Sequence, residues 1–314
     1  MHHMDASTIF TTILAFVLVF LFAIQKFSRQ IQMQSGEHLK TFLAKWSSNP
    51  LKGAASGAFV TALIQSSTAS TVILVGLVNA GVIPVTNALS VVIGANIGAS
   101  VTAQLFALKM TYIAPIIVIL GFIVAHTHSK LRRYGKAIFY FGIIFLSLFT
   151  IGILVEPLRN HPSFINLIQS VSNPFAAIIA GAVITVILQS SSVLTGLVLI
   201  LASSGLIALP TAVGFLFGSA LGSPITPIIA SASANTDAKK VAVAHGLFNY
   251  IGVVFFLTLL PLFTMLLKFI SNDPVQQIVN AHFIFNATCA LFALVFFSQY
   301  EKLVRVTTTV LYKK

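Results

Sequence analysis

A polar five-residue segment occurs twice inside otherwise apolar sequence. Gln65 to Ala69 reads Gln-Ser-Ser-Thr-Ala, and Gln189 to Val193, 124 residues later, reads Gln-Ser-Ser-Ser-Val. The match extends to both sides at a constant offset without a gap, which indicates an internal repeat. Such a pair suggests two half-sites that meet to bind one solute. Further matching positions are Gly57, Thr71, Gly81, Gly94, Gly98 and Thr102, which recur as Gly181, Thr195, Gly205, Gly218, Gly222 and Thr226.

The composition around these segments is that of a membrane protein. Of the 314 residues, 57% are hydrophobic and 8% are charged, whereas a soluble domain carries about 25% charged residues. Since roughly 20 apolar residues span a bilayer as a helix, the chain has room for several spans. We therefore expect one all-α polytopic membrane domain over residues 1–314. No serine cluster is paired with a nearby histidine, and Cys289 is the one cysteine, so the sequence indicates neither an enzyme nor a disulfide framework.

The apolar segments predict two repeats with broken helices. A first span is expected from Ile9 to Ile24, followed by a basic helix at the membrane surface. Repeat one covers about residues 54–126 and repeat two about 174–260. Polar or glycine-rich stretches interrupt the apolar sequence of each repeat, which favours a re-entrant helical hairpin and further helix breaks, a pattern found in transporters. The breaks in repeat one are expected at Gln65–Ser67, Gly81–Pro84 and Gly94–Gly98, and the remaining spans near 113–125, 137–155, 241–260 and 279–297, before a basic tail.

The basic residues predict an orientation. Cytoplasmic loops of membrane proteins collect Lys and Arg, so a net charge of +12 does not require nucleic acid as a partner. If the segment 26–52 is cytoplasmic, the loops at 126–136 and 235–240 and the C-terminus also face the cytoplasm, which puts 15 of the 18 Lys and Arg residues inside. The two repeats are then inverted relative to each other, as alternating access requires, and a bacterial inner membrane fits. The residues left outside are Lys109, Arg159 and Lys268.

The repeated segments have the chemistry of an ion site. A helix break exposes N-terminal amides, which favour anions, and C-terminal carbonyls, which favour cations. Hydroxyl and amide side chains can serve either ion. Neither repeat carries an acidic or basic residue in its apolar core, so a doubly charged anion needs cations bound beside it. The residues alone therefore favour an ion-coupled symporter.

Three motifs resemble the type II sodium–phosphate cotransporter family over about residues 10–298. They are the doubled Gln-Ser-Ser-(Ser/Thr) motif, Gly94-Ala95-Asn96-Ile97-Gly98, and Ala244-His245-Gly246-Leu247-Phe248-Asn249. The resemblance implies sodium-driven uptake of inorganic phosphate, with sodium as coupling ion and no other cofactor. It implies phosphate contacts at Gln65, Ser66, Ser67, Thr68, Ser190, Ser191 and Ser192.

For sodium, the resemblance implies ligands near Gln189, Ser190, Ser219, Ser223 and Thr226, and it matches Asn96. Ser100 and Thr102 supply further oxygens beside the glycines of repeat one. Repeat two departs from the family pattern, because Ala220 replaces the usual Asn and Pro224 stands where a Thr is common. The sequence indicates sodium as the one metal and no transition-metal site.

The sequence leaves several alternatives open. The substrate is either phosphate or another oxyanion, and the coupling ion is either sodium or a proton. A non-transporting membrane sensor or structural subunit is a third class. A homodimer within membrane lipid is compatible with all of them. Two segments, His245-x-x-x-Asn249 and His282-x-x-x-Asn286, are each either a structural hydrogen-bonded pair or part of a proton relay or ion site.

Overall fold

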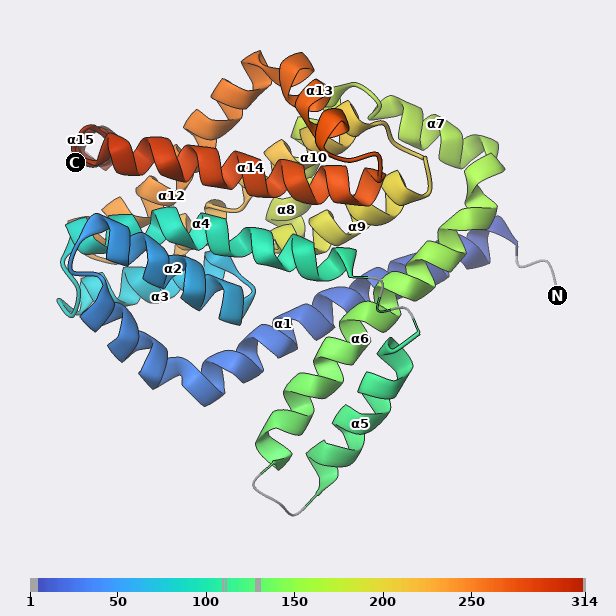
Figure 1. The fold of residues 1–314 in the computed structure, drawn as a ribbon, viewed down its shortest axis with the longest axis horizontal. Helices are drawn as coiled ribbons and strands as arrows, with labels where there is room; N and C mark the ends of the chain where they lie inside the picture. Colours follow the sequence, from blue (N-terminus) through green and yellow to red (C-terminus); the bar gives the residue numbers. More distant parts are fainter. Residues whose placement is uncertain (1–4, 109, 111, 128–130, 313–314) are drawn as a thin grey trace.

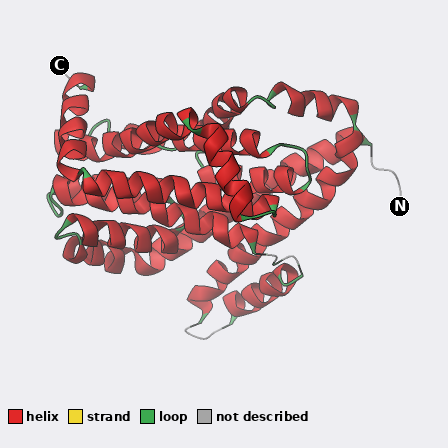
Figure 2. Ribbon diagram, turned by 45° about the horizontal axis from the view of Figure 1, so that its top comes forward, coloured by secondary structure: helices red, strands yellow, loops and turns green. Residues whose placement is uncertain are grey.

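The computed structural model describes residues 5–108, 110, 112–127 and 131–312. The described residues form helices joined by short loops and contain no strand (Figures 1 and 2), which confirms the predicted all-α class. Six of the described helices are long and apolar enough to cross a membrane, so the protein is an integral multi-pass membrane protein. Four basic residues used in the orientation prediction lie outside the described part: Lys109, Lys130, Lys313 and Lys314.

The helices follow one another with few long connections. In chain order they are α1 (Ala6–Trp46), α2 (Pro50–Ile64), α3 (Ser67–Asn79), α4 (Val85–Ala107), α5 (Ala114–His126), α6 (Arg132–Val155), the short 3-10 helix η1 (Glu156–Asn160), α7 (Pro162–Ser170), α8 (Pro174–Leu188), α9 (Ser191–Ser203), α10 (Leu209–Gly222), α11 (Ile225–Ala230), α12 (Thr236–Thr258), α13 (Leu260–Ile270), α14 (Pro274–Val295) and α15 (Phe297–Leu311).

The two repeats have matching helix boundaries. α2 and α8 start and end at positions 124 residues apart, and so do α3 and α9. The local reason is the same in both copies, because Asn49 and Asn173 cap the first helix of each pair through their side chains and a proline follows in its first turn. Each repeat therefore contains a helical hairpin, which we call hairpin one (α2 and α3) and hairpin two (α8 and α9). Their orientation relative to the membrane stays a prediction.

Positive backbone φ angles mark the turns of both repeats. Gln65 and Gln189 have φ of 61° and 51°, and among the described residues they are the non-glycine positions with positive φ. Gly81 and Gly205 adopt φ of 70° and 68° where α3 and α9 end. A left-handed residue ends a helix by turning the next N–H groups back onto the last carbonyls, as Val82 N to Leu77 O and Leu206 N to Leu201 O do, and glycine adopts this conformation at little cost. These four residues again obey the offset of 124.

Glycines bring the first helix of each hairpin against the helix that follows the hairpin, which is α4 in repeat one and α10 in repeat two. A Cβ atom added at Gly94 of α4 would overlap the carbonyl oxygen of Ala54 in α2, and one at Gly218 of α10 would overlap that of Ile178 in α8. Gly98 and Gly222 lie one turn further along and approach α2 and α8 in the same way. This small-residue packing is common between membrane helices. The close backbone contact fixes hairpin one to α4 and hairpin two to α10.

Two predicted helix breaks are corrected by the structure. α4 continues unbroken through Gly94–Gly98, because these glycines accommodate a neighbouring backbone and leave the hydrogen bonding of the helix intact. α1 is one continuous helix of 41 residues (Figure 1), where we predicted a span ending at Ile24 and a separate surface helix. In repeat two, a short break does separate α10 from α11 at Ser223 and Pro224.

The C-terminal part also differs from the prediction. The expected basic tail forms α15, which packs on α12 and α14. Glu301 in α15 accepts hydrogen bonds from Thr86 at 2.7 Å and Arg305 at 2.6 Å, so α15 is tied to the start of α4. α13, and η1 with α7 in the stretch 156–173, are helices that the sequence analysis did not predict. α5 and α6 form an apolar pair that rests on α1 and projects from the other helices (Figure 1).

The glycine packing predicts that alanine destabilises the protein at a crowded glycine but not at an open one. Gly94→Ala inserts a methyl group against the backbone of α2, and such overpacking costs about 1–3 kcal/mol. We expect a melting temperature in detergent that is lower by several degrees. Gly76→Ala in α3 is the matched control, because a Cβ there meets no atom within 4 Å and alanine favours a helix more than glycine does. Equal melting temperatures for the two variants would contradict this account.

Candidate functional site

Both repeated segments adopt the same local structure. Gln65 ends α2 in the left-handed region, and the side chain of Ser66 caps α3 by accepting a hydrogen bond from Ala69 N at 3.1 Å. Ser190 caps α9 by accepting from Val193 N at 3.4 Å. The remaining N–H groups of the first helical turn have no partner within their helix. The sequence therefore builds two exposed helix N-termini inside an apolar protein, as predicted.

These two N-termini meet at one cavity. A cavity of about 300 Å³ lies between hairpin one, hairpin two and α1. We call it the larger cavity, to distinguish it from two small cavities that Ser191 also lines. None of the described residues that line it carries a charge. Its lining consists of Ile24, Gln25, Ser28 and Gln32 of α1, Gln65, Ser66, Thr68, Ala69, Val72 and Ile73 of repeat one, and Gln189, Ser190, Ser191, Ser192 and Thr226 of repeat two.

The predicted phosphate residues lie together at this cavity with one exception. Gln65, Ser66, Thr68 and the three serines of repeat two all line it. Ser67 instead lines two smaller cavities behind it, of about 30 and 10 Å³, which Ser191 also lines. Ser67 and Ser191 thus bring hairpin one and hairpin two to the same small space. The larger cavity has donors from two helix N-termini and several hydroxyls, a suitable set for an oxyanion.

The predicted sodium residues divide between the cavities. Gln189, Ser190 and Thr226 line the larger one. Asn96, Ser219 and Ser223 line the cavity of about 30 Å³, and Thr102 lines the smallest. Ser100 lines none of them, because its hydroxyl donates to His282 O at 3.2 Å and accepts from Asn286 Nδ2 at 3.1 Å.

The hydrogen bond of the Ser223 hydroxyl depends on the proline that follows it. Pro224 has no N–H, so it cannot donate to Ala220 O as the next turn of a helix would require. The Ser223 hydroxyl donates to that carbonyl instead, at 3.3 Å. The proton of Ser223 is therefore directed at the backbone, and its oxygen keeps lone pairs for a cation. The departure of repeat two from the family pattern is thus compatible with a role for Ser223 as a cation ligand.

Three polar residues of α1 at the larger cavity were missed. Gln25, Ser28 and Gln32 line it, and Gln32 Nε2 donates to Ser28 Oγ at 3.0 Å. The sequence analysis placed them in a basic surface helix. Their spacing of three and four residues puts them on one helix face, which is the signal that could have identified them.

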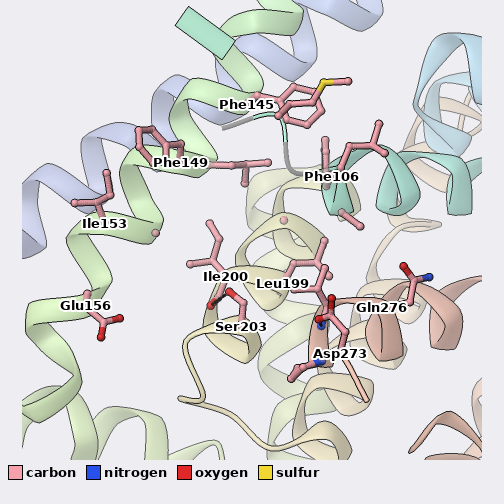
Figure 3. A pocket seen from close by; sticks show the side chains of 18 residues that line it. Phe106, Phe145, Phe149, Ile153, Glu156, Leu199, Ile200, Ser203, Asp273 and Gln276 are labelled. Carbon is pink, nitrogen blue, oxygen red and sulfur yellow. Dashed lines mark hydrogen bonds between the residues drawn. The ribbon is translucent and has the colours of Figure 1, made fainter. Parts of the chain in front are cut away.

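A separate, mainly apolar cavity of about 660 Å³ lies away from these three, between α4, α6, α9 and α14 (Figure 3). Phe106, Phe145 and Phe149 lie on one side of it, and Glu156 and Asp273 lie on the other. Asp273 caps α14 by accepting from Val275 N at 2.9 Å, and Glu156 lies 3.8 Å from Arg159. Because its lining is mainly apolar and lacks the repeated motif, we place the site at the smaller polar cavities.

The two His-Asn segments take part in specific hydrogen bonds. His245 Nδ1 lies 2.9 Å from Thr71 Oγ1 in α3. Asn286 Nδ2 donates to His282 O at 2.9 Å as well as to Ser100. The bond from Asn286 to His282 O agrees with a structural pair in the second segment. In the first segment His245 bonds to α3 instead, and His282 also lines both small cavities. No group of three or more His, Cys, Asp or Glu that could hold a metal ion occurs within the described chain.

Several known proteins are similar to this chain in sequence over most of its length. The uncharacterized protein YqeW of Bacillus subtilis is 29% identical over 294 residues, which cover 93% of this chain and 96% of YqeW. A protein of Escherichia coli K12 named "Putative inorganic phosphate export protein YjbB" is 25% identical over 264 residues, or 83% of this chain. The present chain spans only about half of YjbB, since the match covers 49% of that protein.

Mammalian relatives match over shorter regions. Sodium-dependent phosphate transport protein 2A of Mus musculus is 36% identical over 97 residues, which are 30% of this chain and 15% of the mouse protein. No solved structure matches this chain. A family model described as Na⁺/Pi-cotransporter matches residues 19–152 and 161–299. Because these two segments make up most of the chain, the protein belongs to the Na⁺/Pi-cotransporter family, a family of membrane transporters.

Proposed function

We propose that the protein is a secondary transporter that imports inorganic phosphate together with sodium. One observation carries the proposal: both Gln-Ser-Ser segments, far apart in sequence, line a single uncharged cavity. Membership of the Na⁺/Pi-cotransporter family supports the same substrate and coupling ion. Transport would follow alternating access, with the anion and sodium bound between hairpin one and hairpin two near the membrane midplane.

The larger cavity suits the anion. The N-termini of α3 and α9 contribute partial positive charge and free N–H groups. The hydroxyls of Ser66, Thr68, Ser190, Ser191 and Ser192 supply further donors. A phosphate placed there would be held by neutral groups from both repeats. Movement of either hairpin would then change how many of these groups reach it.

The neighbouring oxygens suit the cation. Sodium takes oxygen ligands, and Asn96, Ser219 and Ser223 bring side-chain oxygens to the cavity of about 30 Å³. Among the described residues, no charged side chain lines either the larger cavity or this one. A bound phosphate therefore needs the charge of co-bound sodium, since an uncompensated anion at membrane depth is expensive. This mutual charge balance is the physical basis we propose for coupling.

The direction of transport follows from the sodium gradient. A symporter driven by inward sodium flow carries phosphate into the cell. The name of YjbB describes export instead, and the sign of the net flux in the proteoliposome assay distinguishes the two directions. We place the protein in a bacterial inner membrane with a cytoplasmic C-terminus and with inverted repeats, on the basis of its basic loops. A homodimer and specific lipid contacts are compatible with this proposal but add nothing to its mechanism.

Replacing sodium tests the coupling directly. Purified protein in proteoliposomes should accumulate labelled phosphate when sodium is higher outside, because sodium entry supplies the driving force. We expect uptake to fall to the protein-free level when sodium is replaced by potassium or choline. Reversing the sodium gradient should reverse the net flux.

Uptake that is unchanged in potassium or choline would remove sodium coupling. A proton gradient that drives uptake without sodium would identify proton symport instead. Competition by sulfate, arsenate and organic acids would show whether another oxyanion is the preferred substrate. Binding of phosphate without any net flux would indicate a sensor or structural subunit.

Serine substitutions test the site. Ser67→Ala and Ser191→Ala each remove a hydroxyl where hairpin one meets hairpin two. Ser191 also lines the larger cavity, and a hydrogen bond to a charged group contributes about 1.5–3 kcal/mol, so we expect Ser191→Ala to lose phosphate uptake at low phosphate at least tenfold. Ser67 lines the small cavities, including the one that we assign to sodium, so we expect Ser67→Ala to weaken uptake through the coupling ion. The melting temperature of both variants should change little. Ser203→Ala is the matched control in α9, since Ser203 lies at the other end of that helix and donates locally to Ile200 O.

The site assignment would be wrong if both Ser67→Ala and Ser191→Ala transported phosphate normally. It would also be wrong if Ser203→Ala impaired uptake as strongly, since that result would move the site to the mainly apolar cavity that Ser203 lines.

A further inference from the structure

The two His-Asn segments place one histidine beside each hairpin. α12 packs on α3, and α14 packs on α9. His245 of α12 contacts Thr71 of α3, whereas His282 of α14 lines the same two small cavities as Thr195 of α9. Thr195 is the repeat counterpart of Thr71, 124 residues later. Each hairpin thus offers an equivalent threonine to a different histidine.

The first pair is joined by a hydrogen bond between buried groups. Thr71 Oγ1 donates to Ser67 O at 2.9 Å and lies 2.9 Å from His245 Nδ1. A hydroxyl has a single proton, so with that proton directed at Ser67 O, His245 Nδ1 is the donor and Thr71 the acceptor. His245 and Thr71 are both fully buried. The bond ties α3 to α12 at a position one helical turn beyond Ser67 of the repeated segment.

The second pair has the same groups without the bond. Thr195 Oγ1 donates to Ser191 O at 3.0 Å, which leaves its oxygen able to accept, as in Thr71. His282 Nδ1 is buried and has no hydrogen-bond partner among the described residues. Buried polar atoms are nearly always paired, so an unpaired one calls for a reason. Thr195 and His282 line the cavities of about 30 and 10 Å³ together, so unfilled space lies beside both groups.

We propose that His282 and Thr195 form this hydrogen bond in the other transport state, while His245 and Thr71 separate. Each state then has one His-Thr bond, and the change of state exchanges one bond for an equivalent one. Two states of similar energy are what alternating access needs. The inference rests on the proposed function, because it assumes that hairpin one and hairpin two move relative to α12 and α14. His245 and His282 are positioning residues, since they act on the phosphate residues through the threonines.

Two valine substitutions test the exchange. Thr71→Val should weaken the state described here, and Thr195→Val should weaken the other. The reporter is Gln25→Cys, in the larger cavity, in a chain whose native cysteine is removed by Cys289→Ser. Membrane-impermeant maleimide is added to one side or the other of oriented proteoliposomes without sodium or phosphate. The ratio of the two labelling rates reports which state predominates.

We expect the two valine variants to move this ratio in opposite directions by roughly two- to tenfold, the effect of one hydrogen bond. The double variant should return to the parent ratio. His282→Ala should reproduce Thr195→Val and add little to it. Thr195→Ser keeps the hydroxyl and should shift nothing.

The two valines are matched, since each also removes the bond from its threonine to the backbone four residues earlier. His282→Ala keeps the backbone bond of Thr195, and Thr195→Ser keeps its hydroxyl, so these two variants separate the common loss from the loss of the His-Thr bond. Shifts in the same direction, or none in variants that remain monodisperse, would overturn the inference. Normal sodium-dependent flux without opposite shifts would remove this inference alone. Opposite shifts without any such flux would support it and remove the proposed function.

Discussion

Backbone polar groups inside a membrane must find partners within the protein, and this constraint governs the site. A helix can break at membrane depth only where its ends are satisfied or face a polar cavity. At Gln65 and Gln189 the chain meets this condition with a left-handed residue that ends one helix and a serine that caps the next. What remains unpaired is the first turn of α3 and α9. Those groups converge on the cavity that we assign to the anion.

The glycine contacts couple the movement of each hairpin to that of a neighbouring helix. α2 and α8 are too short to span a bilayer alone, since 15 residues extend about 22 Å as a helix. Their backbones lie directly against α4 and α10 through Gly94, Gly98, Gly218 and Gly222. α4 and α10 also carry the oxygens that we assign to sodium. A shift of one hairpin therefore moves both the anion groups and the cation groups of its repeat, which is what tight coupling requires.

How much of this could be predicted depends on whether the signal is local. The helix ends at Gln65 and Gln189 could be predicted from polar residues inside apolar sequence. The constant offset of 124 residues showed that the two ends are equivalent positions of a repeat. The continuity of α4 through Gly94–Gly98 was predicted wrongly, because only a neighbouring backbone distinguishes a packing glycine from a helix break. The polar face of α1 was hidden by the basic residues around it. The contact between Thr71 and His245 joins residues 174 positions apart, and no local pattern encodes it.

The repeats share a scaffold but differ in where the glycine-rich stretch after each hairpin carries its polar residues. Where α4 has Ala95, Asn96, Ala99 and Ser100, the equivalent positions of repeat two hold Ser219, Ala220, Ser223 and Pro224. At each of these four positions one copy is polar and the other is not. Polar residues spaced by four share one helix face, and moving both by one position turns that face by about 100°. The two copies therefore present oxygens in different directions, so hairpins of equal shape can enclose a site that is not symmetric. An anion and a cation need different surroundings. Two equivalent halves can provide both when their oxygens point in different directions.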